Sequence, residues 1–171
     1  MLDAIGDATG VEKDLKCCFP DTYKQILSLT YYLVLEEANS MSRFTRWASM
    51  HHHPWSKDIP SQRISELFQS ISEEEKQQFF RLQGKRRLEY EYLAFDTTSV
   101  SSYSRTLKQA KYGKNKEHDP LPQLNLALIF GEESRLPVCY RKLSGNIADV
   151  KTIQTLLNDL DFLGFIILFV I

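Results

Sequence analysis

The chain has 171 residues, of which 43% are hydrophobic and 12% aromatic, and its formal net charge is −1. This composition excludes an intrinsically disordered chain, and the length predicts one domain, or one domain with a helical appendage. The charge is unevenly distributed, because residues 81–116 hold nine basic and three acidic side chains, a net +6, which leaves −7 for the rest. Such an asymmetry is typical of a surface that binds a polyanion.

The start of the chain and its cysteines bear on its location. The first ten residues are acidic and lack an apolar core, so they do not predict a signal peptide. No hydrophobic run approaches the roughly 20 residues that span a bilayer. Cys17 and Cys18 are adjacent and Cys139 falls in a predicted strand, which favours reduced thiols over a disulfide framework. We therefore expect a cytoplasmic protein without membrane association.

Residues 1–87 are predicted to form a helical N-terminal region. The first fifteen residues carry little signal and are expected to be loosely structured. Apolar residues with helical spacing predict a helix from Pro20, in its first turn, to about Asn39. A shorter helix or irregular link is expected over residues 41–53.

Two more helices are predicted before residue 88. Ile64, Leu67 and Ile71 have helical spacing, and Ser72 and Glu75 form a capping box that predicts the start of the second helix. The segment Gly84–Arg87 is expected to close that helix and lead to the first strand. The cluster Lys85, Arg86 and Arg87 then either complements the helix dipole or contacts phosphates, and both interpretations stay open.

Three successive histidines, His51, His52 and His53, precede Pro54. Three histidines suggest a metal site, but successive residues point in different directions on a helix or a strand. A polar turn closed by Pro54 is the favoured interpretation.

Residues 88–171 are predicted to form an α/β domain. A hairpin connection at residues 131–135 predicts that the second and third strands are antiparallel. Asp149 is expected to cap a helix, because a carboxylate accepts hydrogen bonds from the free amides of a first turn. The predicted strands are Leu88–Val100, Gln123–Phe130, Leu136–Leu143 and Phe165–Ile171, and the predicted helix is Val150–Leu160.

Asp96 lies in the middle of the first predicted strand, set among apolar neighbours. A carboxylate is costly to bury unless a cation meets it, and a divalent metal is the best candidate. The hydroxyls of Thr97, Thr98 and Ser99 could order water around such a metal, although Thr in a strand is ordinarily explained by β propensity.

A long polar segment, residues 101–122, separates the first two strands, and loops of this length are usually functional or disordered. Its basic residues are interleaved with aromatic ones, a pattern typical of phosphate contact combined with base stacking, with a solvated surface loop as the alternative. The predicted DNA-binding residues here are Lys108, Lys111, Tyr112, Lys114 and Lys116. Arg141 and Lys142 are predicted to lie on opposite faces of the third strand, so at most one can share that surface.

Several motifs occur in order along this region: Phe95–Ser99, Ala110–Gly113, Leu121–Ala127, Leu136–Val138 and Gly145–Asp149. Together they closely resemble the transposases of bacterial insertion sequences, in the IS-four-like branch. The resemblance covers a little under half the chain, from Tyr90 to Gly164. It implies the first half of a ribonuclease-H-like mixed sheet after the helical region, with Asp96 as the first of three metal-binding carboxylates, a DDE triad.

The resemblance further implies an activity and partners. In the family, the three carboxylates hold two Mg²⁺ ions, or Mn²⁺, for the cleavage and strand transfer of DNA. The implied partners are the DNA ends of the element and a homo-oligomer or mixed oligomer with full-length transposase, in the bacterial cytoplasm near the nucleoid. The implied helical region commonly helps bind element ends, and a packing role is equally open here.

The family continues through a strand ending in the second Asp and, later, a helix supplying Glu. Neither acid occurs in the apolar run from Phe165 to Ile171. We therefore expect a truncated copy that binds Mg²⁺ weakly and does not cleave DNA alone. The alternatives are a DNA-binding or oligomerising fragment that modulates a full-length transposase, and a degenerate product without function.

Overall fold

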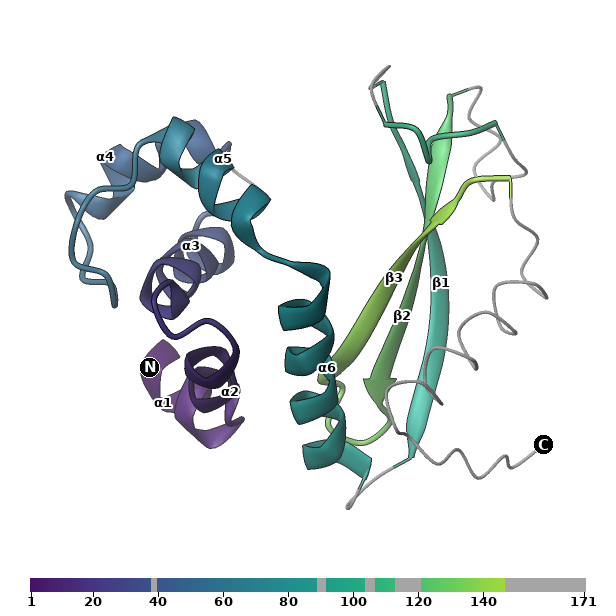
Figure 1. Ribbon diagram of the computed structural model, residues 1–171, viewed down its shortest axis with the longest axis horizontal. Coiled ribbons are helices and arrows are strands. Elements are labelled where there is room, and N and C mark those ends of the chain that lie inside the picture. The colour runs from purple at the N-terminus through teal and green to yellow at the C-terminus, as the bar shows by residue number, and fades with distance from the viewer. Residues whose placement is uncertain (38–39, 89–91, 104–106, 113–120, 147–171) are drawn as a thin grey trace. The chain divides into compact units, whose positions relative to one another are not determined.

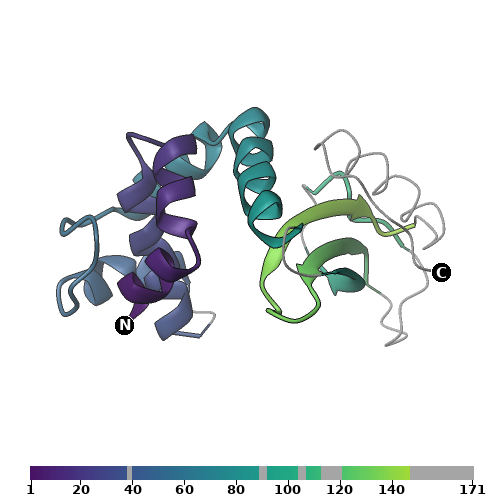
Figure 2. The same ribbon diagram turned by 90° about the horizontal axis from the view of Figure 1, so that it is seen from below.

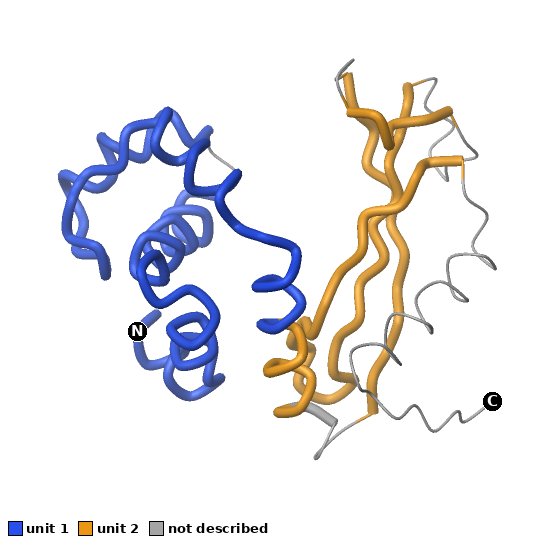
Figure 3. The backbone as a smooth tube through the Cα atoms, in the orientation of Figure 1, with its two compact units in different colours: residues 1–79 blue, residues 80–171 orange. Residues whose placement is uncertain are grey.

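The computed structural model describes residues 1–37, 40–88, 92–103, 107–112 and 121–146 (Figure 1). The chain divides into two compact units, residues 1–79 and residues 80–171 (Figure 3). The predicted helix 150–160 with its cap Asp149, the predicted strand 165–171, and the loop residues Lys114 and Lys116 lie outside the described residues.

The N-terminal segment is helical, so the expectation of a loose start is wrong. Helix α1 spans Leu2–Ala8 and α2 spans Val11–Cys18, separated by Gly10 in the left-handed conformation with φ 72°. Leu15 and Cys18, spaced as on one helical face, are buried. The Tyr31 hydroxyl donates a hydrogen bond to the Asp3 carboxylate at 2.6 Å, which connects α1 to the third helix.

Helix α3 spans Tyr23–Leu35, so the predicted helix exists with shorter bounds. Pro20 lies in the turn before the helix and not in its first turn. Leu27, Leu29 and Tyr32 are buried, whereas the apolar residues at its C-terminal end are exposed.

An aromatic cluster forms the centre of the first unit. The 3-10 helix η1 (Met41–Arg43) leads into α4 (Phe44–Ala48). The centroids of the Phe44 and Trp47 rings each lie 5.6 Å from the centroid of the Tyr32 ring. The Phe44 and Trp47 centroids lie 5.7 Å from one another. The Tyr32 hydroxyl donates to the Ser40 carbonyl at 2.7 Å, so the tyrosine buries its ring without losing its polar partner.

Helices α5 (Ser61–Ser70) and α6 (Glu73–Leu88) follow. The predicted capping box at Ser72 and Glu75 is confirmed by reciprocal hydrogen bonds. Helix α6 continues through the buried Gly84 and ends at Leu88, directly after the segment that is predicted to close it. Leu88 therefore belongs to a helix and not to the first strand.

Three strands form an antiparallel sheet in the order β1-β2-β3, namely β1 (Leu93–Ser101), β2 (Gln123–Gly131) and β3 (Pro137–Ser144). The predicted antiparallel hairpin between the last two is confirmed. Alternate residues of β2 are buried and half-buried, which is the period of a strand with two unlike faces. The prediction of a chain with both helices and a sheet is confirmed.

The C-terminal half of α6 lies beside β3, as two views agree (Figure 1 and Figure 2). The buried Phe80 ring meets the Tyr140 ring edge to face at 5.5 Å. Cys17, Cys18 and Cys139 are reduced thiols. Among the described helices, none combines the length and apolar character needed to cross a bilayer.

Candidate functional site

Asp96 lies at the middle of β1, opposite Leu128 of β2. Its side chain is exposed although its neighbours on the sheet are mostly apolar, so the expectation of a buried carboxylate is wrong. The physical reason is that α6 packs at β3, two strands away, through Phe80 and Tyr140. One carboxylate oxygen, Oδ1, accepts the Thr97 backbone N–H at 2.8 Å, and burial therefore supplies no argument for a metal.

The register of the sheet assigns each strand residue to a face, because antiparallel partners point to the same side. We call the side that carries Asp96 the Asp96 face. Its members are Ala94, Asp96, Thr98, Val100, Leu124, Leu126, Leu128, Phe130, Tyr140, Lys142 and Ser144.

The three hydroxyls after Asp96 are divided between the two faces. Thr98 shares the Asp96 face, whereas Thr97 and Ser99 point to the other side. Ser99 donates a hydrogen bond to Asn125 Oδ1 at 3.0 Å on that other side. Of the three, Thr98 is therefore the one whose hydroxyl lies where it can order water near the Asp96 carboxylate.

The described residues do not complete a metal site at Asp96. They contain no group of three His, Cys, Asp or Glu side chains that could hold an ion. Mg²⁺ requires near-octahedral oxygen coordination, and Asp96 supplies one carboxylate of which Oδ1 already accepts a backbone hydrogen bond. The fit is thus limited to a single ligand within the described part of the chain.

The three successive histidines have separate environments. The His51 ring stacks on Trp47 at 4.8 Å, and His52 is exposed. The predicted turn at Pro54 is present, because the Ser56 N–H donates to the His53 carbonyl at 3.1 Å. The His53 ring is nevertheless buried against Phe44 and Trp47 and not part of a polar surface. Burial, and secondarily the charge of His52, lower the pKa of His53 below its ordinary value of 6.5.

Two buried nitrogens in this cluster, Trp47 Nε1 and His53 Nδ1, make no hydrogen bond within the described residues. A neutral His53 is consistent with that setting, because an imidazolium there would need two hydrogen-bond acceptors. The cluster therefore belongs to the packing of the first unit and offers no described set of metal ligands.

The described part of the long segment between β1 and β2 is held against the end of the sheet. Lys111 and Gln123 exchange two backbone hydrogen bonds of 2.9 and 3.0 Å, and the Gly145 N–H donates to the Gln109 carbonyl at 3.3 Å. The side chains of Lys108, Lys111 and Tyr112 are exposed, with Tyr112 at 72%. A fixed backbone carrying exposed cations and an aromatic ring is suited to phosphate contact and stacking.

The second predicted cluster lies at the end of a helix, as expected. Lys85, Arg86 and Arg87 occupy the last turns of α6, and Lys85 is exposed. Cations at this position complement the negative end of the helix dipole, which accounts for their placement without any ligand.

The two groups of cations lie at opposite ends of the sheet (Figure 1). Lys111 pairs with Gln123, which also pairs with Ser101 at the C-terminal end of β1. Helix α6 ends shortly before Leu93, at the N-terminal end of β1. Nine residues of β1 separate these ends by about 26 Å. Among the described residues, the predicted cations therefore do not surround Asp96 and do not form one continuous patch.

Comparison with protein-family models, with curated proteins and with solved structures gives no match to this chain. The functional assignment therefore depends on the motifs and on the geometry of Asp96 and the cations.

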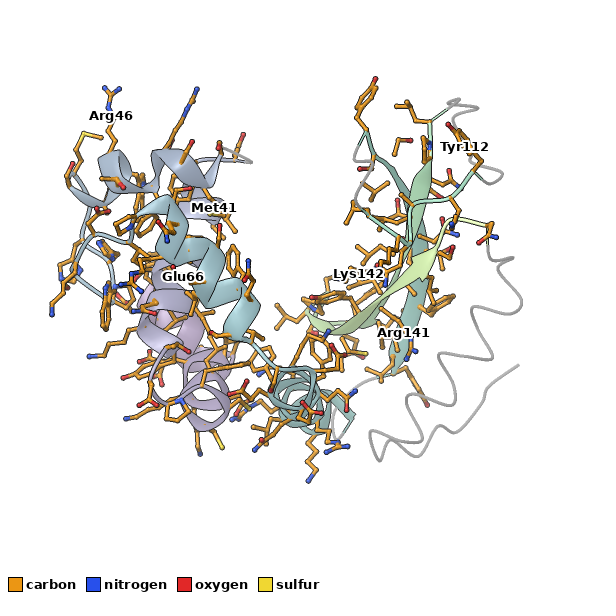
Figure 4. The ribbon with its side chains drawn as sticks, turned by 45° about the horizontal axis from the view of Figure 1, so that its top comes forward. Met41, Arg46, Glu66, Tyr112, Arg141 and Lys142 are labelled. Carbon is orange, nitrogen blue, oxygen red and sulfur yellow. The ribbon has the colours of Figure 1, made fainter. Side chains whose placement is uncertain are left out.

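The sequence did not decide which of Arg141 and Lys142 shares the surface of Asp96. Their predicted placement on opposite faces is confirmed: Lys142 pairs with Leu126 on the Asp96 face, and Arg141 pairs with Ala127 on the other (Figure 4). The choice depends on an irregularity in the register between Ile129 and Phe130, and no residue type in the hairpin predicts it.

Proposed function

We propose that this chain is a DDE-type DNA transposase chain of a bacterial insertion element. Asp96 supplies one carboxylate ligand for Mg²⁺ or Mn²⁺, and exposed lysines contact DNA phosphates. The observation that carries this proposal is the position of Asp96, exposed at the centre of the first strand of a three-stranded antiparallel sheet. A carboxylate there is open to a metal and to a phosphodiester.

The topology supports the ribonuclease-H-like part of the proposal. The order β1-β2-β3 leaves the outer edge of β1 without a described partner strand. That edge is where the family resemblance requires a parallel strand, whose carboxylate would emerge beside Asp96. The described sheet is therefore compatible with the first half of such a domain.

The charge supports DNA as the partner. Exposed cations flank the sheet at both ends, at Lys111 and at Lys85, within the segment of net charge +6. Neutralising phosphates with such cations releases counterions, which drives DNA binding without sequence preference. Self-association or mixed oligomers with a full-length transposase are part of the same proposal.

A second candidate is a DNA-binding or oligomerising chain that modulates a full-length transposase without cleaving DNA. It is favoured by the single carboxylate ligand among the described residues. The two candidates share DNA binding and differ in metal-dependent chemistry, so one experiment separates them.

The test is a nicking and strand-transfer assay with Mg²⁺ or Mn²⁺, run beside a gel-shift titration of the same samples. The substrate is a duplex of the DNA that flanks the coding sequence, including its terminal repeats. Asp96→Asn is compared with Asp58→Asn, which removes an exposed carboxylate from the first unit. DNA binding by Asp96→Asn is expected to be unchanged or slightly tighter, because a charge that repels phosphate is lost.

Cleavage that is abolished in Asp96→Asn and kept in Asp58→Asn would support the transposase with Asp96 as a metal ligand. It would also contradict the expectation that the chain does not cleave DNA alone, because another carboxylate would then have to complete the site. Shifted DNA without cleavage would support the second candidate. A chain that binds neither the flanking duplex nor an unrelated duplex of the same length would overturn both.

A further inference from the structure

We propose that Lys142 contacts a phosphate of the DNA strand that passes over Asp96. This inference rests on the proposed function, and it assigns to the site a positioning residue that the motifs do not contain. Those predicted cations that the structure describes lie at the two ends of the sheet, whereas Lys142 lies on the face of Asp96 itself.

The register sets the spacing of the two residues. Asp96 lies in one row with Leu128, and Lys142 lies in the adjacent row of the same face with Leu126 and Thr98. Two strand spacings and a two-residue offset along the strands put their Cα atoms about 12 Å apart. That distance corresponds to the rise of roughly three or four base pairs along the axis of a DNA duplex.

The polar side chains of these two rows are accessible. Asp96, Thr98 and Lys142 are exposed, and Leu126 and Leu128 between the strands are half-buried. Lys142 forms no ion pair with any described residue.

The presence of the Asp96 carboxylate on the same face favours a phosphate as the ligand of Lys142. A site built around a carboxylate repels the DNA backbone, and a flexible, strongly hydrated ammonium on the same face offsets that repulsion. Lys142 thus contacts the DNA strand at a phosphate that lies a few nucleotides from the phosphodiester bond over Asp96.

Arg141 provides a matched control on the same strand. It is exposed and carries the same charge, but it pairs with Ala127 and points to the opposite face (Figure 4). Removing either charge changes the net charge of the chain equally, so a difference between the two variants reports on the face and not on overall electrostatics.

The experiment measures the salt dependence of the dissociation constant of the full chain for a fluorescent duplex of the flanking DNA, by anisotropy. Lys142→Gln is expected to weaken binding several-fold and to reduce the slope of log affinity against log salt by about one. Arg141→Gln is expected to leave the slope unchanged, and Lys142→Arg to keep it. Far-UV circular dichroism checks that each variant is folded.

A slope that Lys142→Gln leaves unchanged, or that Arg141→Gln reduces equally, overturns the inference while the proposed function stands. Absence of any DNA binding by the unmodified chain overturns both. If Lys142→Gln alters self-association in sedimentation experiments and not the DNA slope, the Asp96 face is a protein interface, and the inference is also overturned.

Discussion

The Glu75 backbone N–H donates to Ser72 Oγ at 3.2 Å, and the Ser72 N–H returns a hydrogen bond to the Glu75 carboxylate at 2.9 Å. The Ser72 hydroxyl also donates to that carboxylate at 2.7 Å. These bonds lower the pKa of Glu75 below its ordinary value of 4.5. The reciprocal pair satisfies free amides at the start of α6 and fixes where the helix begins.

The first prediction concerns this cap. A carboxylate whose pKa is lowered by folding stabilises the protein above its unfolded pKa, and the contribution is lost as the pH falls through the folded pKa. Ser72→Ala is therefore expected to lower the melting temperature by a few degrees at pH 7 and by less at pH 3. Ser61→Ala is the control, because the Ser61 hydroxyl makes no cap at α5. Equal losses at both pH values would contradict the role of Glu75.

The second prediction concerns Gly145, after β3. A Cβ atom at this position would lie 2.0 Å from the Gln123 carbonyl oxygen, which belongs to backbone and cannot move aside without disturbing β2. Gly145→Ala is expected to reduce the free energy of unfolding by about 3 kcal/mol. The measurement is urea unfolding followed by circular dichroism.

Gly6→Ala is the matched control for Gly145→Ala. The nearest atom to a Cβ at Gly6, in α1, is Glu12 Cβ at 3.9 Å, an ordinary contact. Because alanine favours a helix over glycine, this variant is expected to be as stable as the unmodified chain or more so. If both variants lose stability to a similar extent, the steric explanation fails.

The third prediction concerns His53. Its pKa is lowered in the folded state, so the unfolded chain binds a proton that the folded chain does not. Stability is therefore expected to fall as the pH drops below 6.5, the ordinary value, and to keep falling until the folded pKa is reached. Melting temperatures between pH 7.5 and pH 5 should show the decrease.

His53→Phe is expected to keep the ring contacts with Phe44 and Trp47 and to lose most of this pH dependence. His52→Asn, at the exposed neighbouring position, is expected to retain it. An unchanged pH profile in His53→Phe would assign the effect to another group.

The fourth prediction concerns the two groups of cations. Because Lys111 and Lys85 adjoin opposite ends of the sheet, their contributions to DNA binding should be independent. Lys111→Gln and Lys85→Gln are each expected to weaken binding several-fold, and the double variant by the product of the two factors. Lys13→Gln, an exposed lysine in α2, is the control. Anisotropy titrations that give a strongly non-additive double variant would contradict separate contacts.

The elements that could be predicted from sequence are those set by local signals. The Ser72 cap and the hairpin between β2 and β3 each depend on a few adjacent residues, and both are present. Helix α2 was missed although Leu15 and Cys18 have helical spacing, because the short run is interrupted by Gly10. Its stability comes from burial against the rest of the unit, which no local pattern contains.

The errors at the candidate site have tertiary causes. Gly84 ordinarily disfavours a helix, yet α6 continues to Leu88, a predicted strand residue, because Phe80 and Gln83 just before the glycine are buried. The exposure of Asp96 depends on which strand α6 covers, and the face of Lys142 depends on a register irregularity beyond the hairpin. The burial of His53 results from its contacts with aromatic residues of another segment.

The separation of the two groups of cations sets a minimum length for the DNA that can use both. A span of about 26 Å corresponds to roughly eight base pairs. A shorter duplex reaches one end of the sheet at a time, whereas a longer one bound at Lys111 presents its phosphates to Lys85 at a high effective concentration. Affinity should therefore rise once the duplex exceeds this length, and replacing either lysine should reduce the rise by the factor that this lysine contributes.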